Sequence, residues 1–418
     1  MTKDKKGFIN RWHNIIYMWK RVIDTLPESY IEDLSPRVPI KKIKLVGKTL
    51  VADFLRMFKA SRIPQSKIWF LILSENNIQA LKATKEQTPH SIYVTYFRFR
   101  SSLNANLHTF SLGIKFLYDL IYPLTWFKFY LNDKVTARRF YDMLFTVNGT
   151  YEASVRLLKK KKPQAIVFTN DHMVTSRSLL LAANHLGIHT YYIQHASVTN
   201  NFPPLEFIYA LLEGDDALNK YKACGEVKSE VYLVGMPKFD SYANCVNTND
   251  KLEILGVAYN LIDDLEFISK FLVQLMAENP NLTVVARAHP ADQRVLPIIS
   301  GVEISNPKEE SAFEFLNRID GLVASDSSIH LEAVLVNVYP CYYTFGEGYK
   351  YDSYGYISQG LVEDFKTMEA LSLKLQELSL LKPNIQHKAT YYNASIGKDF
   401  YGKSALKCSE IILKTLKA

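Results

Sequence analysis

Side chains able to take part in phosphate or sugar chemistry stand at the ends of four separate apolar runs of the chain. These groups are Asp171 with His172; His195; Arg287 with His289 and Pro290; and Asp326, Ser327 and Ser328 with Glu332. A neutral imidazole can take a proton from a hydroxyl group, and serine hydroxyls can donate hydrogen bonds to phosphate oxygens. A single histidine after a strand is more often structural than catalytic, so the functional interpretation rests on the four groups together.

The last group lies in residues 321–334, which indicate a strand, a polar turn and a helix. Leu322–Ser325 predicts the strand, Asp326 or Ser327 suits the N-cap, and His330–Val338 predicts the helix. Hydroxyls, amide hydrogens and the positive end of a helix dipole would meet there, which suits a phosphate. An ordinary capped helix explains the same residues equally well.

The elements that must position these groups alternate between strands and helices. Fully apolar runs such as Ile68–Leu73 are typical of parallel strands buried on both faces. The alternation predicts an α/β fold with two doubly wound, Rossmann-like domains facing each other across a cleft. We expect a basic helical extension over residues 1–60, an acceptor domain over 61–240, a nucleotide-donor domain over 252–400 and a final helix over 401–418.

The N-terminal extension has the pattern of an amphipathic helix. Its apolar residues recur at helical spacing between lysines and arginines: Phe8, Trp12, Ile15, Ile16, Trp19, Val22, Ile23 and Leu26. Two interpretations fit, an interfacial helix on anionic lipid and a helix packed on the body of the protein. The aromatic, helical segment 108–160 similarly fits an acceptor groove, a membrane contact or a buried helical hairpin.

Composition narrows the class of partner. The 418 residues carry a formal net charge of +8 and are 13% aromatic, which suits nucleic acid, anionic lipid or a phosphorylated small molecule. No nucleic-acid-binding motif is present, so nucleic acid is not expected. Four widely spaced cysteines indicate free thiols, and no uncharged run reaches the roughly 18 residues of a membrane span. We expect a cytoplasmic protein, peripheral on the inner face of the membrane.

Two pairs of adjacent aspartates are candidate metal ligands. Asp215–Asp216 and Asp263–Asp264 both lie on predicted helices. Neighbouring side chains on a helix diverge, so we expect both pairs to be solvated. No metal and no other cofactor is predicted.

Three of the strand ends resemble a known family. Gln194–His195, Arg287–Pro290 and the turn Ser325–Ser328 with Glu332 are similar to the GT-B enzymes of bacterial surface-polysaccharide assembly. These include the CDP-glycerol glycerophosphotransferases of teichoic acid synthesis and the capsule transferases for Kdo and sialic acid. The resemblance covers about residues 160–345. It departs from the usual pattern at Ala196, where glycine is common, and at Arg287, where lysine is frequent.

The resemblance implies roles for these residues. His195 would be the general base on the acceptor hydroxyl, with Asp171 and Glu213 in reserve, and a carboxylate nucleophile would serve a retaining enzyme. The donor site would comprise Arg287, His289, Pro290, Asp326, Ser327, Ser328 and Glu332. Within it Ser327 and Ser328 would bind phosphate, and His289 would bind a phosphate or the sugar beside it. Pro290 would fix the turn, and Glu332 would accept hydrogen bonds from the ribose. The donor would be CMP-, CDP- or UDP-linked, and the acceptor a glycan or lipid-linked glycan.

Three functions remain open from the sequence. The first is a transferase that moves a sugar or polyol phosphate onto a growing capsule, O-antigen or teichoic-acid-like polymer. The second is an enzyme like UDP-N-acetylglucosamine 2-epimerase, which needs no acceptor groove or membrane helix. The third is a non-catalytic scaffold of a polysaccharide assembly complex.

Overall fold

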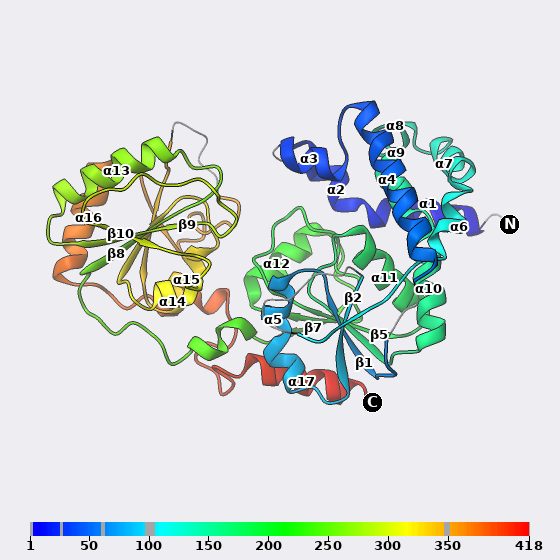
Figure 1. The fold of residues 1–418 in the computed structure, drawn as a ribbon. Coiled ribbons are helices and arrows are strands. Elements are labelled where there is room, and N and C mark those ends of the chain that lie inside the picture. Colours follow the sequence, from blue (N-terminus) through cyan, green and yellow to red (C-terminus); the bar gives the residue numbers. More distant parts are fainter. Residues whose placement is uncertain (1–2, 26–27, 60–62, 97–104, 347–351, 418) are drawn as a thin grey trace.

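The computed structural model describes residues 3–25, 28–59, 63–96, 105–346 and 352–417. Figure 1 shows two α/β lobes side by side, each built on its own twisted sheet, with a group of helices from the N-terminal third lying against the first lobe. Leu26 of the amphipathic pattern lies outside the described residues.

The first sheet has seven parallel strands in the order β3-β2-β1-β4-β5-β6-β7. Its strands are β1 (Ile68–Ile72), β2 (Ser91–Thr95), β3 (Leu107–Thr109), β4 (Ala165–Phe168), β5 (His189–Ile193), β6 (Tyr209–Leu212) and β7 (Glu230–Leu233). The helices of this lobe are α5 (Glu75–Glu86), α6 (Lys115–Asp119), α7 (Tyr122–Tyr130), α8 (Lys134–Arg139), α9 (Tyr141–Val147), α10 (Thr150–Lys161), α11 (Val174–His185) and α12 (Asp215–Cys224).

The second sheet has six parallel strands in the order β10-β9-β8-β11-β12-β13. Its strands are β8 (Ile254–Tyr259), β9 (Thr283–Ala288), β10 (Val302–Ser305), β11 (Gly321–Ala324), β12 (Tyr339–Tyr343) and β13 (Glu363–Phe365). Its helices are α13 (Leu265–Glu278), α14 (Ala312–Leu316), α15 (Ile329–Leu335) and α16 (Met368–Leu380).

All strands are parallel, but the sequence order of the strands changes direction within each sheet. The change lies between β1 and β4 in the first sheet and between β8 and β11 in the second. This is the doubly wound arrangement, which places a ligand crevice beyond the carboxyl ends of the strands at the reversal. The prediction of two doubly wound parallel sheets is confirmed.

Burial on both faces explains why the strands read as continuous apolar runs. Trp69 and Leu71 of β1 pack in one cluster with α10 and α11, while Phe70 and Ile72 pack in another with α5 and the C-terminal helix. Successive residues of a strand point to opposite faces, so every position of β1 must be apolar.

The C-terminal helix α17 (Ser404–Thr415) belongs to the first lobe. Cys408, Ile411 and Ile412 are buried against the first sheet, and Figure 1 shows the red helix beneath that lobe. Asp240 of the short helix η2 (Pro237–Tyr242) accepts hydrogen bonds from the backbone amides of Ser404 and Ala405, at 2.9 and 2.7 Å. The chain therefore leaves the second lobe through η3 (Gln386–Tyr391) and ends on the first.

The N-terminal helices are α1 (Lys3–Ile15), α2 (Tyr17–Val22), η1 (Ile23–Thr25), α3 (Glu28–Leu34) and α4 (Pro39–Met57). Trp12, Ile16 and Trp19 of the amphipathic pattern are buried against α7, α8 and α9. The face proposed to enter a membrane is therefore packed inside the protein, and the packed-helix interpretation is the correct one. In the part of the chain that the structure describes, no helix is both long and apolar enough to span a bilayer.

Candidate active site

The strand ends at the reversal of the second sheet are tied together by polar side chains. Asp263 Oδ2 accepts from the Asn260 backbone amide at 2.7 Å and from the Ser325 hydroxyl at 2.9 Å. Asn260 Nδ2 donates to Ser325 Oγ at 3.1 Å. The end of β8 is thus bonded to the end of β11. Asp263 was predicted to be solvated, and that prediction is wrong because its carboxylate is buried in this turn.

The same prediction fails for one member of the other aspartate pair, because Asp215 is exposed as expected but Asp216 is not. Asp216 is buried, and its carboxylate forms an ion pair with Lys220 at 2.7 Å. Among the described residues, no group of three His, Cys, Asp or Glu side chains is arranged to hold a metal ion.

The turn between β11 and α15 presents two serine hydroxyls. Ser327 and Ser328 are partly exposed. Ser327 Oγ accepts weakly from the Ile329 amide at 3.4 Å, and the hydroxyl of Ser328 has no hydrogen-bond partner in the described chain. Both hydroxyls are therefore available to a ligand.

The predicted N-cap of this helix is wrong. The N-cap is Ser328, without a side-chain cap bond. The Asp326 carboxylate instead accepts a hydrogen bond at 3.1 Å from the backbone amide of Ser353, in a loop distant in sequence. Behind the turn, His330 Nε2 bonds to the Ser325 carbonyl at 2.9 Å, and burial lowers the pKa of His330 to about 4. This imidazole holds the turn as a neutral group.

His289 and Pro290 are exposed beyond the end of β9. His289 Nδ1 accepts a hydrogen bond from the Ala291 amide at 3.1 Å. The proton of the neutral ring therefore resides on Nε2, which can donate to a phosphate oxygen.

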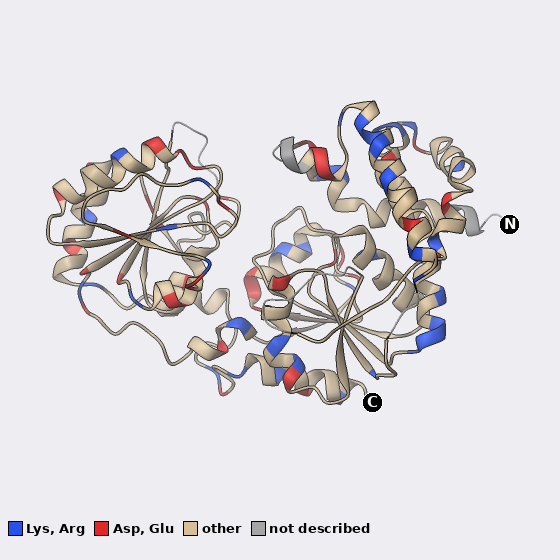
Figure 2. Ribbon diagram, viewed as in Figure 1, with Lys and Arg blue, Asp and Glu red and all other residues tan. Residues whose placement is uncertain are grey.

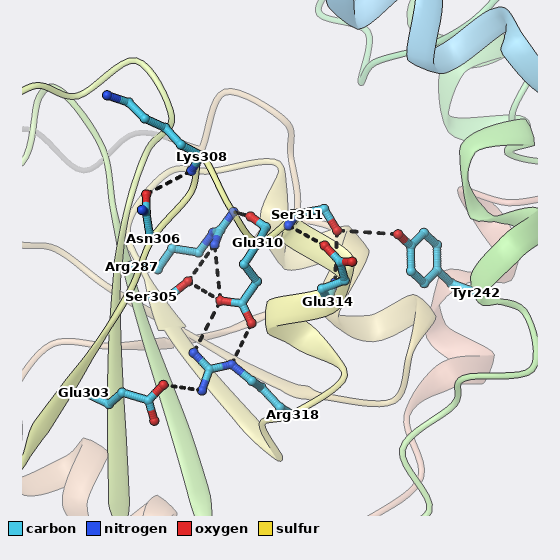
Figure 3. A network of polar contacts seen from close by, with 10 residues as sticks. All are labelled: Tyr242, Arg287, Glu303, Ser305, Asn306, Lys308, Glu310, Ser311, Glu314 and Arg318. Atoms are coloured by element: carbon cyan, nitrogen blue, oxygen red, sulfur yellow. Dashed lines mark hydrogen bonds and ion pairs between the residues drawn. The ribbon is translucent and has the colours of Figure 1, made fainter. Parts of the chain in front are cut away.

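Arg287 does not reach the donor turn. Its guanidinium donates to Ser305 Oγ at 2.6 Å and to the Glu310 carbonyl at 2.8 Å, and lies over the Phe315 ring. Figure 3 shows Arg287 within a network of polar contacts that also includes Arg318. The Nε of Arg318 donates a hydrogen bond to the Glu310 carboxylate at 2.7 Å. Arg287 of β9 pairs with Ser305 of the neighbouring strand β10. The Arg287 side chain therefore points into the protein, although His289, two residues later, is exposed. The predicted donor contact of Arg287 is not supported by this geometry.

His195 lies directly beyond β5 and is partly exposed. Burial, and then the positive charge of Lys238, lower the pKa of His195 to about 4. Its Nδ1 is buried without a partner in the described chain. At neutral pH the ring is uncharged and can accept a proton.

The two reserve candidates are far less accessible. Asp171 is buried and forms an ion pair with Arg177 at 3.2 Å; burial raises the pKa of Asp171 to about 6 in spite of that pair. Its neighbour His172 lies against the rings of Trp19 and Phe202. The carboxylate therefore stabilises the interior of the first lobe.

Glu213, at the end of β6, is also buried. Gln194 Nε2 donates to its Oε2 at 3.2 Å, and its Oε1 has no partner in the described chain. Burial raises the pKa of Glu213 to about 7, while Lys238 acts in the opposite direction. A carboxyl group with this pKa exchanges protons readily at neutral pH, but among the three candidates only His195 has an exposed surface.

Lys238 joins the two lobes. Its ammonium lies 2.6 Å from Glu332 Oε1, which α15 carries in the second lobe. Burial disfavours the charged ammonium, but Glu332 and Glu213 outweigh burial and raise the pKa of Lys238. Since Lys238 also acts on His195, this cation links the predicted donor residue Glu332 with both candidate bases.

Further contacts hold the lobes together beside Lys238. The hydroxyls of Ser197 and Tyr356 lie 2.6 Å apart, and the Ala394 amide, just after η3, donates to the Glu213 carbonyl at 2.8 Å. Gly214 faces the backbone of Tyr392 so closely that a Cβ would lie 2.6 Å from its carbonyl atoms. The sequence offered no sign of these pairings, because Lys238 stands at the very end of the expected acceptor domain 61–240, outside any periodic pattern, and Tyr356 in an aperiodic loop.

The sequence matches no protein-family model and no curated protein. Its fold, however, is similar to those of solved sugar-nucleotide enzymes. UDP-GlcNAc 2-epimerase from Neisseria meningitidis, bound to UDP-GlcNAc, aligns with 83% of this chain and 99% of its own, at a TM-score of 0.56 and 13% identity.

Two transferase structures are similar to about the same degree. The glycotransferase of kitacinnamycin aligns over 85% of this chain and 100% of its own, with a TM-score of 0.53 and 12% identity. The wall teichoic acid polymerase TagF aligns over 90% and 97%, with a TM-score of 0.50 and 12% identity. The protein therefore has the GT-B type of fold, as the sequence predicted.

Proposed function

We propose that the protein is a transferase that moves a sugar or a polyol phosphate from a nucleotide-activated donor to a growing bacterial surface polysaccharide. The observation that carries this proposal is the junction at Lys238, where Glu332 of one lobe meets the surroundings of His195 and Glu213 of the other. A two-substrate reaction needs its donor and acceptor groups to face each other at such a place.

The donor would bind beyond the second sheet. Ser327, Ser328 and the Nε2 hydrogen of His289 would donate to the phosphate oxygens, and Glu332 would accept from the ribose hydroxyls. Binding would require Glu332 to share or release Lys238, which then becomes available to the phosphate charge. No metal is needed for this arrangement.

His195 would act as the general base. The acceptor hydroxyl would attack the transferred group as His195 takes its proton, and the nucleotide would leave with the electrons of the broken bond. The serines and His289 would stabilise the negative charge that develops on the leaving nucleotide. With a glycan or lipid-linked acceptor, such a reaction would take place in the cytoplasm at the inner face of a membrane.

Support for this reading comes from the fold shared with TagF, one structure of which was soaked with CDPG. The fold shared with a UDP-GlcNAc-bound 2-epimerase favours a second candidate, in which a UDP-sugar is inverted at C2 without any acceptor. Glu213 is buried and its pKa is raised to about 7, which would suit proton exchange in such an enzyme.

Calorimetric titration of CMP-, CDP- and UDP-linked donors tests the proposal. We expect one nucleotide class to bind and to be released as free nucleotide only when an acceptor is present. Incubation with UDP-GlcNAc in deuterated water identifies the alternative, since inversion at C2 would exchange the C2 hydrogen. Absence of binding by every donor would exclude both enzymes and favour the scaffold.

A further inference from the structure

In the first lobe, α4 and the neighbouring α6–α7 segment expose apolar side chains that no described part of the chain covers. On α4, Ile40, Ile43 and Val51 are 56%, 58% and 59% exposed and recur at helical spacing. On the α6–α7 segment, Leu120, Leu124 and Phe127 are similarly exposed, at 61%, 68% and 54%. We call these exposed side chains of α4 and α6–α7 the α4–α7 face.

Contacts between α4 and α6 hold the two parts of the α4–α7 face together. Lys115 of α6 is buried and bonds Asp53 of α4 at 2.8 Å and Asp119 at 2.6 Å. The rings of Phe54 and Phe116 are in contact, with centroids 5.2 Å apart. The two stripes are therefore fixed beside each other in the folded chain.

The charged residues of α4, α6 and α7 indicate what kind of partner fits the α4–α7 face. The only acidic residues on α4, α6 and α7, all of whose residues the structure describes, are Asp53 and Asp119, and both are buried. The cations Lys44, Lys48 and Lys128 are exposed on the same helices. Figure 2 shows α4 carrying several basic positions along its length. Glu32 of α3 pairs with Lys41 at the start of α4, at 2.7 Å, but the helices of the face themselves expose lysines and no carboxylate. Such a surface is complementary to anionic lipid headgroups over an acyl layer.

The position of the α4–α7 face fits a membrane contact. In Figure 1, α4, α6 and α7 lie on the side of the first lobe that points away from the second lobe. Docking there would leave the junction at Lys238 uncovered. The helix α4 has 19 residues, which at 1.5 Å each gives a contact about 28 Å long.

We propose that the α4–α7 face docks on an anionic lipid bilayer, with α4 and α7 lying in the interface plane. This inference deepens the membrane partner of the proposed function and rests on it. It replaces the N-terminal helices α1 and α2 in that role, because their apolar face is already buried.

Vesicle sedimentation tests the proposal on the full-length protein without donor or acceptor. Vesicles of phosphatidylcholine with a quarter phosphatidylglycerol should bind the protein, and vesicles of phosphatidylcholine alone should bind it more weakly. The double variant Val51→Glu with Leu124→Glu should reduce binding at least tenfold, because it places two carboxylates in the contact. Lys44→Gln with Lys48→Gln should remove the preference for anionic vesicles and its sensitivity to salt.

The matched control is Val295→Glu with Ile298→Glu. These apolar side chains are 85% and 99% exposed in the second lobe, so the control makes the same chemical change far from the α4–α7 face. We expect it to bind vesicles as the unaltered protein does, and all variants to keep their melting temperature.

Three results would overturn the inference. They are failure of the unaltered protein to bind anionic vesicles, equal loss of binding in the control, and a dimer that Val51→Glu with Leu124→Glu converts to a monomer without any vesicle binding. The last result would assign the face to a second copy of the chain. Since no nucleotide is present, vesicle binding and donor binding can fail independently of each other.

Discussion

The ion pair between Lys238 and Glu332 should couple the two lobes more strongly than an exposed pair of equal length. The two side chains are 2.6 Å apart and 29% and 14% exposed. Lys270 and Glu266 on α13 form a matched control at 2.7 Å, with exposures of 76% and 78%. The two pairs are almost equal in length but differ in their access to solvent, and the control pair lies within a single helix.

Solvent access sets the expected magnitude. A helical pair in water contributes about 0.3–0.5 kcal/mol, because water screens each charge. Less water surrounds Lys238 and Glu332, so the attraction is stronger, although the cost of desolvating both groups offsets part of it. We expect a coupling free energy of about 1–3 kcal/mol, the upper part of the range seen for residues in contact.

A double-mutant cycle measures this quantity. The four proteins carry Lys238→Met, Glu332→Gln, both or neither, and urea unfolding gives the free energy of unfolding of each. The same cycle on Lys270→Met and Glu266→Gln supplies the control value. A coupling for the first pair no larger than that of the second would refute the reasoning, since the junction would then hold no energetically significant ion pair.

Three further predictions concern other parts of the molecule. Trp12→Ala should lower the free energy of unfolding by about 3–5 kcal/mol, because Trp12 is 3% exposed in the N-terminal cluster; an unchanged melting curve would contradict that packing. Gly214→Ala should loosen the lobes and raise their protease sensitivity, whereas Gly47→Ala, where a Cβ meets no atom within 4 Å, should not. His195→Asn should keep donor affinity and lose turnover by about 10²–10⁴-fold, and near-normal turnover would move the base to Glu213.

The fold could be predicted because its signals are local. Parallel strands buried on both faces must be apolar at every position, and β1 shows this in consecutive residues. The amphipathic pattern of the first helices was equally clear, but periodicity reports only that one face avoids water. Whether protein or lipid covers that face depends on α7, α8 and α9, which lie about a hundred residues further along the chain.

The site was less predictable because its contacts are long-range. The strand ends were found, but the inward turn of Arg287 depends on its register partner Ser305, and the loss of Asp326 as a cap depends on Ser353. Lys238 lies in a segment without hydrophobic periodicity, so nothing in the sequence indicated its role. Residues whose roles come from a neighbouring strand or a docked loop have no signature in their own segment of sequence.

The central claim is that a nucleotide donor binds at the turn between β11 and α15. Calorimetry with the tightest-binding donor tests it on Ser327→Ala with Ser328→Ala. The control is Ser269→Ala with Ser379→Ala, whose hydroxyls bond helix carbonyls of α13 and α16 at 2.9 Å. Each charge-assisted hydrogen bond contributes about 1.5–3 kcal/mol, so donor affinity should fall at least tenfold, with an unchanged melting temperature. Normal donor affinity in the turn variant, with early melting, would show that these serines only stabilise the start of a helix and would contradict the account.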